Sequence, residues 1–440
     1  MNHSDKRSLT AERPRLQLPT LEWRELLQGT IVSGTTGLAL VPLLQSAFGL
    51  EFSEAVTCSI IHSLLLCTSV LFFGINLAPG WITPVLPLVL AFVLGTYDSP
   101  TERFQAMTAL SINFFVLTFF LGITGLGQKL FNWMPRALKG GIVIGAAMAA
   151  FKRVFLDDIE TFLAAPVATS VALVVCFLLL FSQPVLRFRE KYKIIDGLAN
   201  LGLLPCLIFA GVVGWWLGEL QFTISWGFFA PEFSSLWEKS SPYYIGWPTL
   251  DMYMQGIPLS LVAYTMLFGD IVTGDEITKS AQHTRPDNQI QLNLKRVHTS
   301  VAARNLLMAV SAPFFSSQGV LWAGVQVVVV QRWKRGSDKM ASLMSGIGSY
   351  YIGAPLVFFL LPALSLLTPL MDIALSMTLV ITGYACAYVA MEIPKNATER
   401  GVVFVTGMAM VLFEPWLALS IGLAMNVLLV SSEAGNLGSE

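Results

Sequence analysis

Charged residues are scarce in this chain of 440 residues. Only 12% of the residues are charged, against roughly 25% in an ordinary soluble protein, while 54% are hydrophobic. The net charge is −1, and Lys and Arg form no basic stripe of the kind that nucleic-acid binding requires. This composition argues against a soluble domain and a nucleic-acid partner, and it points to the lipid bilayer.

Enzyme and metal-site motifs are also missing. The sequence has no H-E-x-x-H, no G-x-S-x-G and no P-loop, and it has only four His. Five Cys lie in apolar blocks without C-x-x-C spacing, which indicates packing residues rather than metal ligands or disulfides. We therefore expect no enzyme activity, no metal site and no cofactor. Residues 1–24 are polar and carry no short apolar core, so no signal peptide is expected there.

The hydrophobic residues fall in blocks of about 20, the length that crosses roughly 30 Å of hydrocarbon. The sequence predicts an all-α membrane protein with about 14 transmembrane segments. The predicted spans are 26–47, 54–74, 78–96, 107–127, 137–155, 162–186, 198–218, 254–273, 298–312, 314–331, 342–363, 368–390, 399–413 and 415–432.

The distribution of Lys and Arg predicts the orientation. With the N-terminus in the cytoplasm, 23 of the 27 basic residues, Arg304 among them, fall on the cytoplasmic side. Only Arg103, Lys152, Arg153 and Lys239 fall outside. Basic residues concentrate in cytoplasmic loops, so both termini are expected in the cytoplasm of a multi-pass protein of the cell (inner) membrane.

The spans divide into two halves. Seven precede the long connection 219–253 and seven follow it, and an odd number per half makes the second half inverted. Short matches recur in order: Leu27-Gln28-Gly29 with Met254-Gln255-Gly256, and Ala78-Pro79 with Ala312-Pro313. The predicted parts are a cytoplasmic tail (1–25), a first repeat (26–218), an outer connection (219–253) with amphipathic pieces, a second repeat (254–432) and a tail (433–440).

Spans 3 and 10 are predicted to be broken helices. Pro79, Pro84 and Pro87 crowd the start of span 3, and Pro313 followed by Ser316, Ser317, Gln318 and Gly319 opens span 10. Irregular backbone at membrane depth must line protein or a water-filled cavity, so 77–83 and 312–319 are expected to face each other near the midplane. The substrate would bind between the two half-helix N-termini. The alternative is that these prolines are ordinary kinks.

Few ionisable residues lie inside spans, and Asp270 stands out among them. It ends the apolar run of span 8, near the expected helix C-terminus, where the dipole disfavours a carboxylate. It is either a coupling or binding group or a charge at the cytoplasmic interface. In span 1, a polar stripe that includes Thr35 alternates with Gly29, Gly34 and Gly37, and it either lines a cavity or packs helices closely.

At these residues the chain resembles the nucleobase/ascorbate transporter family, the uracil–xanthine permeases. The likeness lies in Leu27-Gln28-Gly29 through Leu40–Leu44, in Trp81-Ile82-Thr83-Pro84-Val85, and in Gly269-Asp270. The resemblance implies seven plus seven inverted spans, core and gate domains, proton- or sodium-coupled uptake (symport) and often a homodimer.

Two positions depart from this family. Its substrate-binding Glu of span 8 falls on Met266, and its span 10 signature falls on Ala323–Gln326. The sulfate permease family shares the scaffold and has no need of that Glu.

The sequence therefore predicts a secondary active transporter of a small solute, nucleobase-like by resemblance, working by alternating access. The alternatives are an inorganic or organic anion transporter or exchanger and a passive channel. The expected substrate-binding residues are Pro79, Gly80, Trp81, Thr35, Thr265, Met266, Ser316, Ser317 and Gln318, with Asp270 as the ion-coupling residue.

Overall fold

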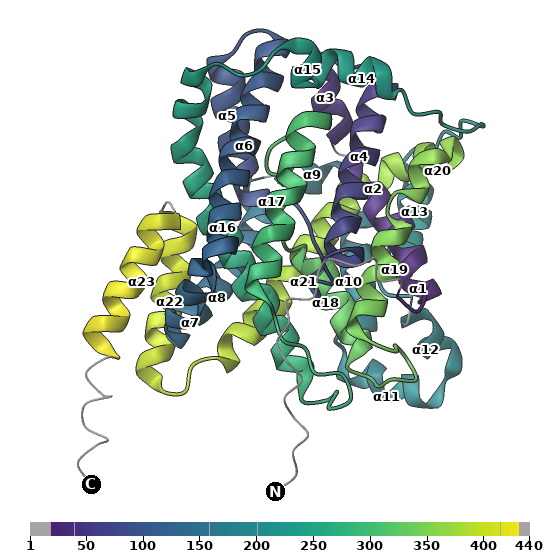
Figure 1. Ribbon diagram of the computed structural model, residues 1–440. Coiled ribbons are helices and arrows are strands. Elements are labelled where there is room, and N and C mark those ends of the chain that lie inside the picture. The colour runs from purple at the N-terminus through teal and green to yellow at the C-terminus, as the bar shows by residue number, and fades with distance from the viewer. Residues whose placement is uncertain (1–18, 39, 158, 200, 414, 431–440) are drawn as a thin grey trace, which may run out of the picture.

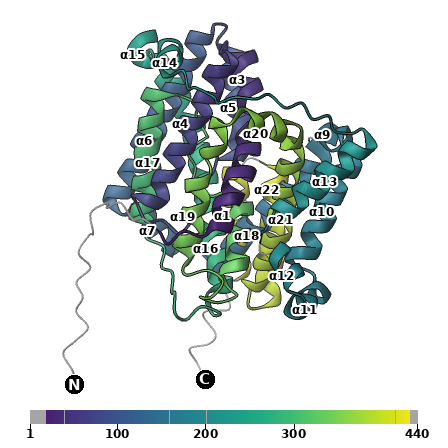
Figure 2. The same cartoon turned by 90° about the vertical axis from the view of Figure 1, so that its right-hand side faces the viewer.

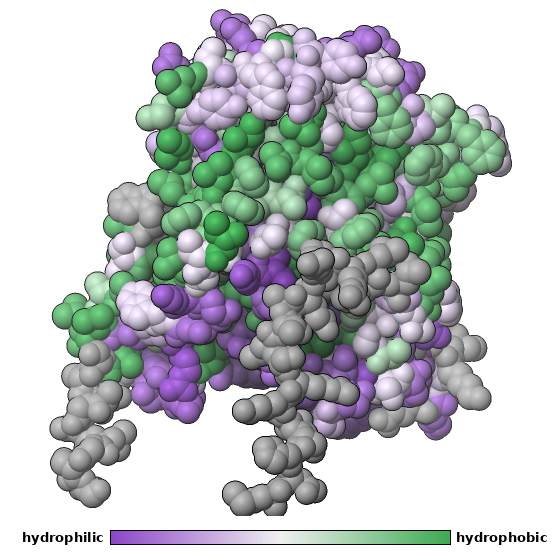
Figure 3. Space-filling view, viewed as in Figure 1, coloured by the Kyte–Doolittle hydropathy of each residue, from purple (hydrophilic) through white to green (hydrophobic). Residues whose placement is uncertain are grey.

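The computed structural model describes residues 19–38, 40–157, 159–199, 201–413 and 415–430. In this part of the chain the regular structure is helical, apart from one isolated bridge between Phe228 and Leu360. The predicted tails lie almost entirely outside the described residues. Figure 3 shows a band of hydrophobic surface between two hydrophilic ends on the face in view, as expected for a protein that spans a bilayer.

One group of helices forms the core domain. Its members pack on one another around α4 and α6: α17 lies along α6, α16 packs on α6 and α18, and α19 packs on α1 and α4. The core helices are α1 (Trp23–Gln28), α2 (Gly34–Gly37), α3 (Leu40–Phe48), α4 (Phe52–Leu71), α5 (Leu86–Thr96), α6 (Pro100–Thr124), α16 (Leu250–Gln282), α17 (Leu294–Ser311), α18 (Ala323–Trp333) and α19 (Leu343–Gly353).

A second group forms the gate domain. Here α8 packs on α21 and α22, and α10 packs on α13 and α21. The gate helices are α8 (Arg136–Lys152), α9 (Ile159–Ala164), α10 (Pro166–Leu180), α13 (Leu204–Leu217), α20 (Leu361–Leu367), α21 (Met371–Glu392), α22 (Ala397–Leu412) and α23 (Pro415–Leu429). The domains meet where α16 contacts α8 and α18 contacts α21. The connector α7 (Leu126–Trp133) links the core helix α6 to the gate helix α8.

The connections lie at the two ends of the molecule. In Figures 1 and 2, α14 (Phe233–Ser240) and α15 (Pro242–Ile245) cover the upper end, while α11 (Gln183–Lys191) and α12 (Lys193–Ala199) lie at the lower end. Glu54 of α4 holds α14 through Lys239 at 2.7 Å and through Ser235. The segment 219–253 therefore carries short helices, and α14 is fixed to the core.

Local sequence signals set the helix ends. At the start of α6, the Ser99 hydroxyl accepts a hydrogen bond from the Glu102 amide, and the Glu102 carboxylate accepts one from the Ser99 amide. Pro100 occupies the first helical turn, where its missing N–H is harmless. Gly125, with a φ of 71°, ends the helix in the left-handed conformation that glycine adopts without strain.

Several predicted spans differ from the observed helices. Five helices of the described chain are long and apolar enough to cross a bilayer, Trp23–Phe48, Phe52–Leu71, Pro100–Thr124, Leu250–Gln282 and Leu361–Glu392, because the other spans are shorter or interrupted. The helix α16 continues nine residues past the predicted end of span 8. Asp270 therefore lies inside α16, and its predicted position near the helix C-terminus is wrong.

The glycine stripe of span 1 packs helices closely. A Cβ atom on Gly37 would lie 2.9 Å from the Phe358 ring. Thr30 donates a hydrogen bond to the carbonyl oxygen of Gly353 at 3.1 Å, so the first span lies directly on α19 and the turn after it. Thr35 is fully buried and donates to the Ile31 carbonyl oxygen of its own helix at 2.6 Å. These contacts favour helix packing over a cavity lining.

Candidate functional site: two crossing segments

Two non-helical segments meet in the middle of the core domain, as the prolines predicted. We call residues 77–82 and 314–322 the crossing segments. The Ile82 amide donates to the Ser316 carbonyl oxygen at 2.7 Å, and the Trp322 amide donates to the Ala78 carbonyl oxygen at 2.6 Å. The pairing is antiparallel, because residues that rise in number in one segment meet residues that fall in the other.

Each crossing segment leads into a half-helix. The first is followed by a 3-10 turn, Thr83–Val85, and then by α5. The second leads into α18, which begins at Ala323, so the non-helical backbone extends three residues beyond the predicted 319. The two half-helices begin at opposite ends of the pairing. Their N-terminal N–H groups and dipoles therefore place partial positive charge on both sides of it.

Two glycines allow the segments to approach. A Cβ atom on Gly80 would lie 2.7 Å from the Cβ of Trp322, and one on Gly319 would lie 2.8 Å from the Gly80 carbonyl oxygen. Real Cβ contacts essentially never fall below 3.0 Å. Glycine at both positions is thus a packing requirement of the pairing.

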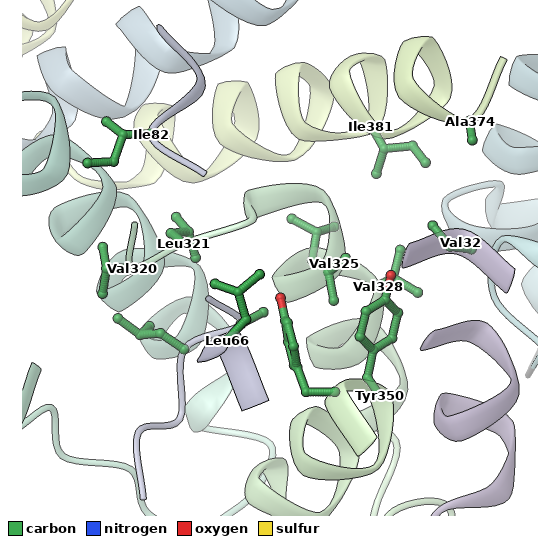
Figure 4. Close-up of a cluster of buried hydrophobic side chains, with 14 of the residues drawn as sticks. Val32, Leu66, Ile82, Val320, Leu321, Val325, Val328, Tyr350, Ala374 and Ile381 are labelled. Carbon is green, nitrogen blue, oxygen red and sulfur yellow. The ribbon is translucent and has the colours of Figure 1, made fainter. Parts of the chain in front are cut away.

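Buried apolar side chains pack around the paired crossing segments. Figure 4 shows Ile82, Val320 and Leu321 of the crossing segments in one buried cluster with Leu66 of α4 and Tyr350 of α19. Close packing in this cluster holds the irregular backbone in place.

The predicted residues of the first crossing segment are held by neighbours from other spans. The Tyr351 hydroxyl of α19 donates to the Pro79 carbonyl oxygen. The Trp81 ring is half-buried and lies 6.0 Å, centroid to centroid, from the Phe314 ring. Pro79, Gly80 and Trp81 are thus brought together with the second crossing segment.

Ser316 has an unusual conformation. Its φ is 82°, and it is the one residue other than glycine with a positive φ in the described chain. The left-handed region is strained for serine and is found more often at functional sites than elsewhere. The residue is fully buried, and its hydroxyl has no hydrogen-bond partner among the described residues.

Ser317 and Gln318 are fully buried and partnered. The Ser317 hydroxyl lies 3.0 Å from the sulfur of Met308. The Gln318 side-chain Nε2 donates to the His62 carbonyl oxygen at 3.4 Å, and its Oε1 accepts from the Arg304 guanidinium at 3.3 Å. His62 itself donates from Nε2 to the Ala312 carbonyl oxygen at 2.8 Å, as a buried core histidine would.

One stripe of α16 runs past the crossing segments. Met266, Asp270, Gly274 and Thr278 are spaced four residues apart and so lie on one face. A Cβ atom on Gly274 would lie 2.8 Å from Leu77 and 3.0 Å from Leu321, one in each crossing segment. The predicted Thr265 and Met266 are half-buried, and the Thr265 hydroxyl donates to the Val262 carbonyl oxygen. The closest approach of α16 is therefore two turns beyond Met266.

Asp270 lies one turn from that closest approach. It forms no hydrogen bond or ion pair within the described chain, and its helix α16 packs against α8 and α21 of the gate domain. Asp270 thus lies on the core side of the boundary with the gate domain.

Gln326 is a further residue of the site, and the sequence alone did not single it out. It is fully buried in the first turn of α18. Its side chain accepts from the Ala78 amide at 2.8 Å, and it donates to the Asn76 carbonyl oxygen at 3.2 Å and to the Thr278 hydroxyl at 2.9 Å. One side chain thereby joins α18, α16 and the first crossing segment.

A small cavity lies beside this network. Its volume is about 140 Å³, and Asn76, Asp275, Thr278, Lys279 and Arg296 contribute to its lining. Asp275 is paired with Lys279 at 2.5 Å. Thr278 lines the cavity and also accepts a hydrogen bond from Gln326, which in turn binds the first crossing segment at Ala78. The Gln326 side chain therefore links the cavity lining to the first crossing segment.

The architecture is that of an inverted seven-plus-seven repeat with two broken spans at its centre. Solved structures with the same fold include "The transmembrane domain of a cyanobacterium bicarbonate transporter BicA". The match has a TM-score of 0.53 at 13% sequence identity and covers 92% of this chain and 99% of that one. A second match, "The overall structure of SLC26A9", has a TM-score of 0.52 at 13% identity and covers 93% of this chain.

This chain spans 65% of the SLC26A9 chain. Comparison with protein-family models gave no match, and comparison with curated protein sequences gave none either. The structural matches establish the fold and confirm the fold class expected from the sequence.

Proposed function

We propose that this protein is a secondary transporter of a small inorganic anion, bicarbonate being the first candidate, and that it works by alternating access between core and gate. The observation that carries the proposal is Ser316: a strained, fully buried serine with an unpartnered hydroxyl at the start of the pairing. Its carbonyl group already binds the Ile82 amide, next to the first half-helix.

The chemistry of this place suits an anion. Helix N-termini attract negative charge through their free N–H groups and dipoles, and a hydroxyl group can donate a hydrogen bond to the same ligand. The proteins with this fold named above are a bicarbonate transporter and SLC26A9, which also supports an anion.

A nucleobase has less support than an anion. The nucleobase permeases use a carboxylate at the position of Met266, and here that side chain is an apolar thioether on the stripe of α16. We therefore place the anion ahead of the nucleobase suggested by the resemblance.

Asp270 is proposed as the coupling group. Its position on the stripe of α16, which packs on the gate helices α8 and α21, one turn from the contact of Gly274 with both crossing segments, would let proton or sodium binding change with the movement of the core. The inner membrane, cytoplasmic termini and a homodimer belong to the same proposal, by the charge distribution and the family resemblance.

The test measures ligand binding by thermal stability of the purified full-length protein. A ligand that binds only the folded state stabilises it by mass action, so bicarbonate, chloride or sulfate should raise the melting temperature, and uracil and xanthine should not. Stabilisation by a nucleobase alone would contradict the proposal.

Two adjacent serines make a matched pair of variants for this test. Ser316→Ala should weaken the anion effect about tenfold, the value of one hydrogen bond to a charged ligand, with little change in the stability of the unliganded protein. Ser317 is expected from the sequence to bind the substrate, but in the structure its hydroxyl is directed at the Met308 sulfur, so we propose that Ser317→Ala leaves anion binding unchanged. Equal effects of the two substitutions would exclude Ser316 from the site.

A further inference from the structure

Arg304 is a fully buried arginine in the middle of α17. The charge distribution counted Arg304 with the cytoplasmic residues, and the structure places it inside α17, against the second crossing segment. The other arginine with comparable burial, Arg285, is paired with Asp287 at 2.7 Å. Arg304 has no carboxylate within ion-pair distance in the described residues.

The contacts of Arg304 are to neutral groups. Its guanidinium donates to the Gln318 side-chain oxygen at 3.3 Å and to the Gly319 carbonyl oxygen at 2.9 Å, while its Nε has no partner in the described chain. Asn305 donates to the Gln318 carbonyl oxygen at 3.1 Å. These hydrogen bonds fix the guanidinium on the backbone of the crossing segment, and its full positive charge remains uncompensated.

The guanidinium charge of Arg304 is separated from the first crossing segment by a single residue, Gly319. Gly319, which accepts from Arg304 on one side, faces the Gly80 carbonyl oxygen and Ile82 on the other. Burying an unpaired charge is costly, and in membrane proteins such groups usually serve a binding or transport site. A counter-charge arriving at the crossing segments would offset the cost.

We propose that Arg304 is the fixed counter-charge that selects anions at the crossing segments. It acts through Gln318 and Gly319 without touching the ligand, so it is a positioning and specificity-determining residue. At an effective dielectric constant of about 20, a unit charge about 8 Å away changes the affinity for a monovalent anion roughly 30-fold. This inference rests on the proposed anion transport and adds the residue that sets its charge selectivity.

The experiment separates the charge of Arg304 from its shape. Arg304→Lys keeps the charge and loses the planar fork, whereas Arg304→Gln and Arg304→Met remove the charge. Lys295→Gln is the matched control, because it removes one positive charge from an exposed position on the same helix. Each full-length variant is reconstituted in liposomes, and the half-saturation concentration for bicarbonate and the melting temperature without ligand are measured.

We expect Arg304→Lys and Lys295→Gln to stay within about threefold of the wild type in half-saturation concentration. Arg304→Gln and Arg304→Met should raise it roughly 30-fold, while the melting temperature without ligand stays level or rises, because a buried unpaired charge has been removed. A purely structural role would instead lower the melting temperature of both neutral variants and leave the half-saturation concentration of those that fold unchanged.

Two results overturn the inference. One is a neutral variant with wild-type half-saturation concentration, and the other is a lysine variant as impaired as the glutamine variant. If Arg304→Gln does not fold, Arg304→Met and Arg304→Lys supply the same comparison. Absence of anion transport by the wild type would refute the proposed function itself, which is a different result from wild-type transport that is insensitive to Arg304.

Discussion

Replacing Gly80 by alanine tests the pairing of the crossing segments most locally. The added methyl group would lie 2.7 Å from the Trp322 Cβ and 2.9 Å from the Trp322 amide nitrogen. Restoring an ordinary contact requires the segments to separate by nearly 1 Å, by the usual carbon–carbon contact distance of about 3.5 Å. The hydrogen bond from the Trp322 amide to the Ala78 carbonyl oxygen, now 2.6 Å, would then be broken or severely stretched.

The expected loss of folding free energy has two parts, the broken hydrogen bond and the inserted methyl group. Losing the hydrogen bond costs about 1 kcal/mol, and inserting a methyl group into a well-packed region costs about 1–3 kcal/mol. A total of about 2–4 kcal/mol should lower the melting temperature in detergent by about 2–4 °C. Uptake should fall roughly tenfold or more, because displaced groups at a site lose activity steeply.

Gly95→Ala is the matched control for this prediction. Gly95 lies in α5 of the same span, and a Cβ atom there would meet nothing within 4 Å. Alanine is favoured over glycine in a helix by about 1 kcal/mol, so this variant should be as stable as the wild type or more so, with normal uptake. A Gly80→Ala protein with wild-type melting temperature and uptake would refute the close pairing.

Four further predictions follow from other parts of the structure. Gln326→Met should cost about 1–3 kcal/mol, since the buried Ala78 amide loses its acceptor, and the melting temperature would show it. Asp270→Asn should abolish accumulation against a gradient and spare exchange, whereas Asp251→Asn at the exposed start of α16 should change neither; accumulation by the Asp270 variant would remove it as the coupling group. Arg285→Met should cost about 3 kcal/mol of folding free energy and so lower the melting temperature, because the Arg285 guanidinium donates to the carbonyl group at the end of α18 and to two carbonyl groups of the following loop. Terminal tags should be accessible only from the cytoplasm of intact cells, and a terminus found outside would contradict the fourteen-span topology.

The Arg285 variant also carries a pH dependence. Hydrogen bonds from Arg285 hold the pKa of Asp287 below its ordinary value. A lowered carboxyl pKa stabilises the folded protein above the unfolded pKa, and this contribution is lost as the pH falls through the folded pKa. The part of the stability difference that comes from Asp287 should therefore be present at neutral pH and disappear in acid.

The broken spans could be predicted from the sequence because their cause is local. Pro79 and Pro313 lack a backbone N–H donor in any tertiary structure, and the serines that follow Pro313 favour non-helical backbone. The inverted repeat could be predicted for a similar reason, because hydrophobic run lengths and loop charges are properties of the chain itself.

The partners of these segments could not be predicted in the same way. Gln326 meets the Ala78 amide across 248 positions of sequence, and nothing near Gln326 indicates that contact. The burial of Arg304 was missed because nothing near it in the sequence indicates that Gln318 and Gly319 pack against its guanidinium. Gly274 was missed because a small residue in a helix gives no sign of what approaches it.

Counterflow of a labelled anion in proteoliposomes tests the central claim most directly. Liposomes loaded with unlabelled bicarbonate are diluted into a trace of labelled bicarbonate, and internal label is followed over time. A transporter that alternates between two states exchanges the internal anion for the external one, so internal label should rise above its equilibrium level and then decay. Uptake that only approaches equilibrium, with no overshoot at any internal concentration, would indicate a passive channel and contradict alternating access. If no labelled bicarbonate enters at all, the proposal that the protein transports this anion is contradicted.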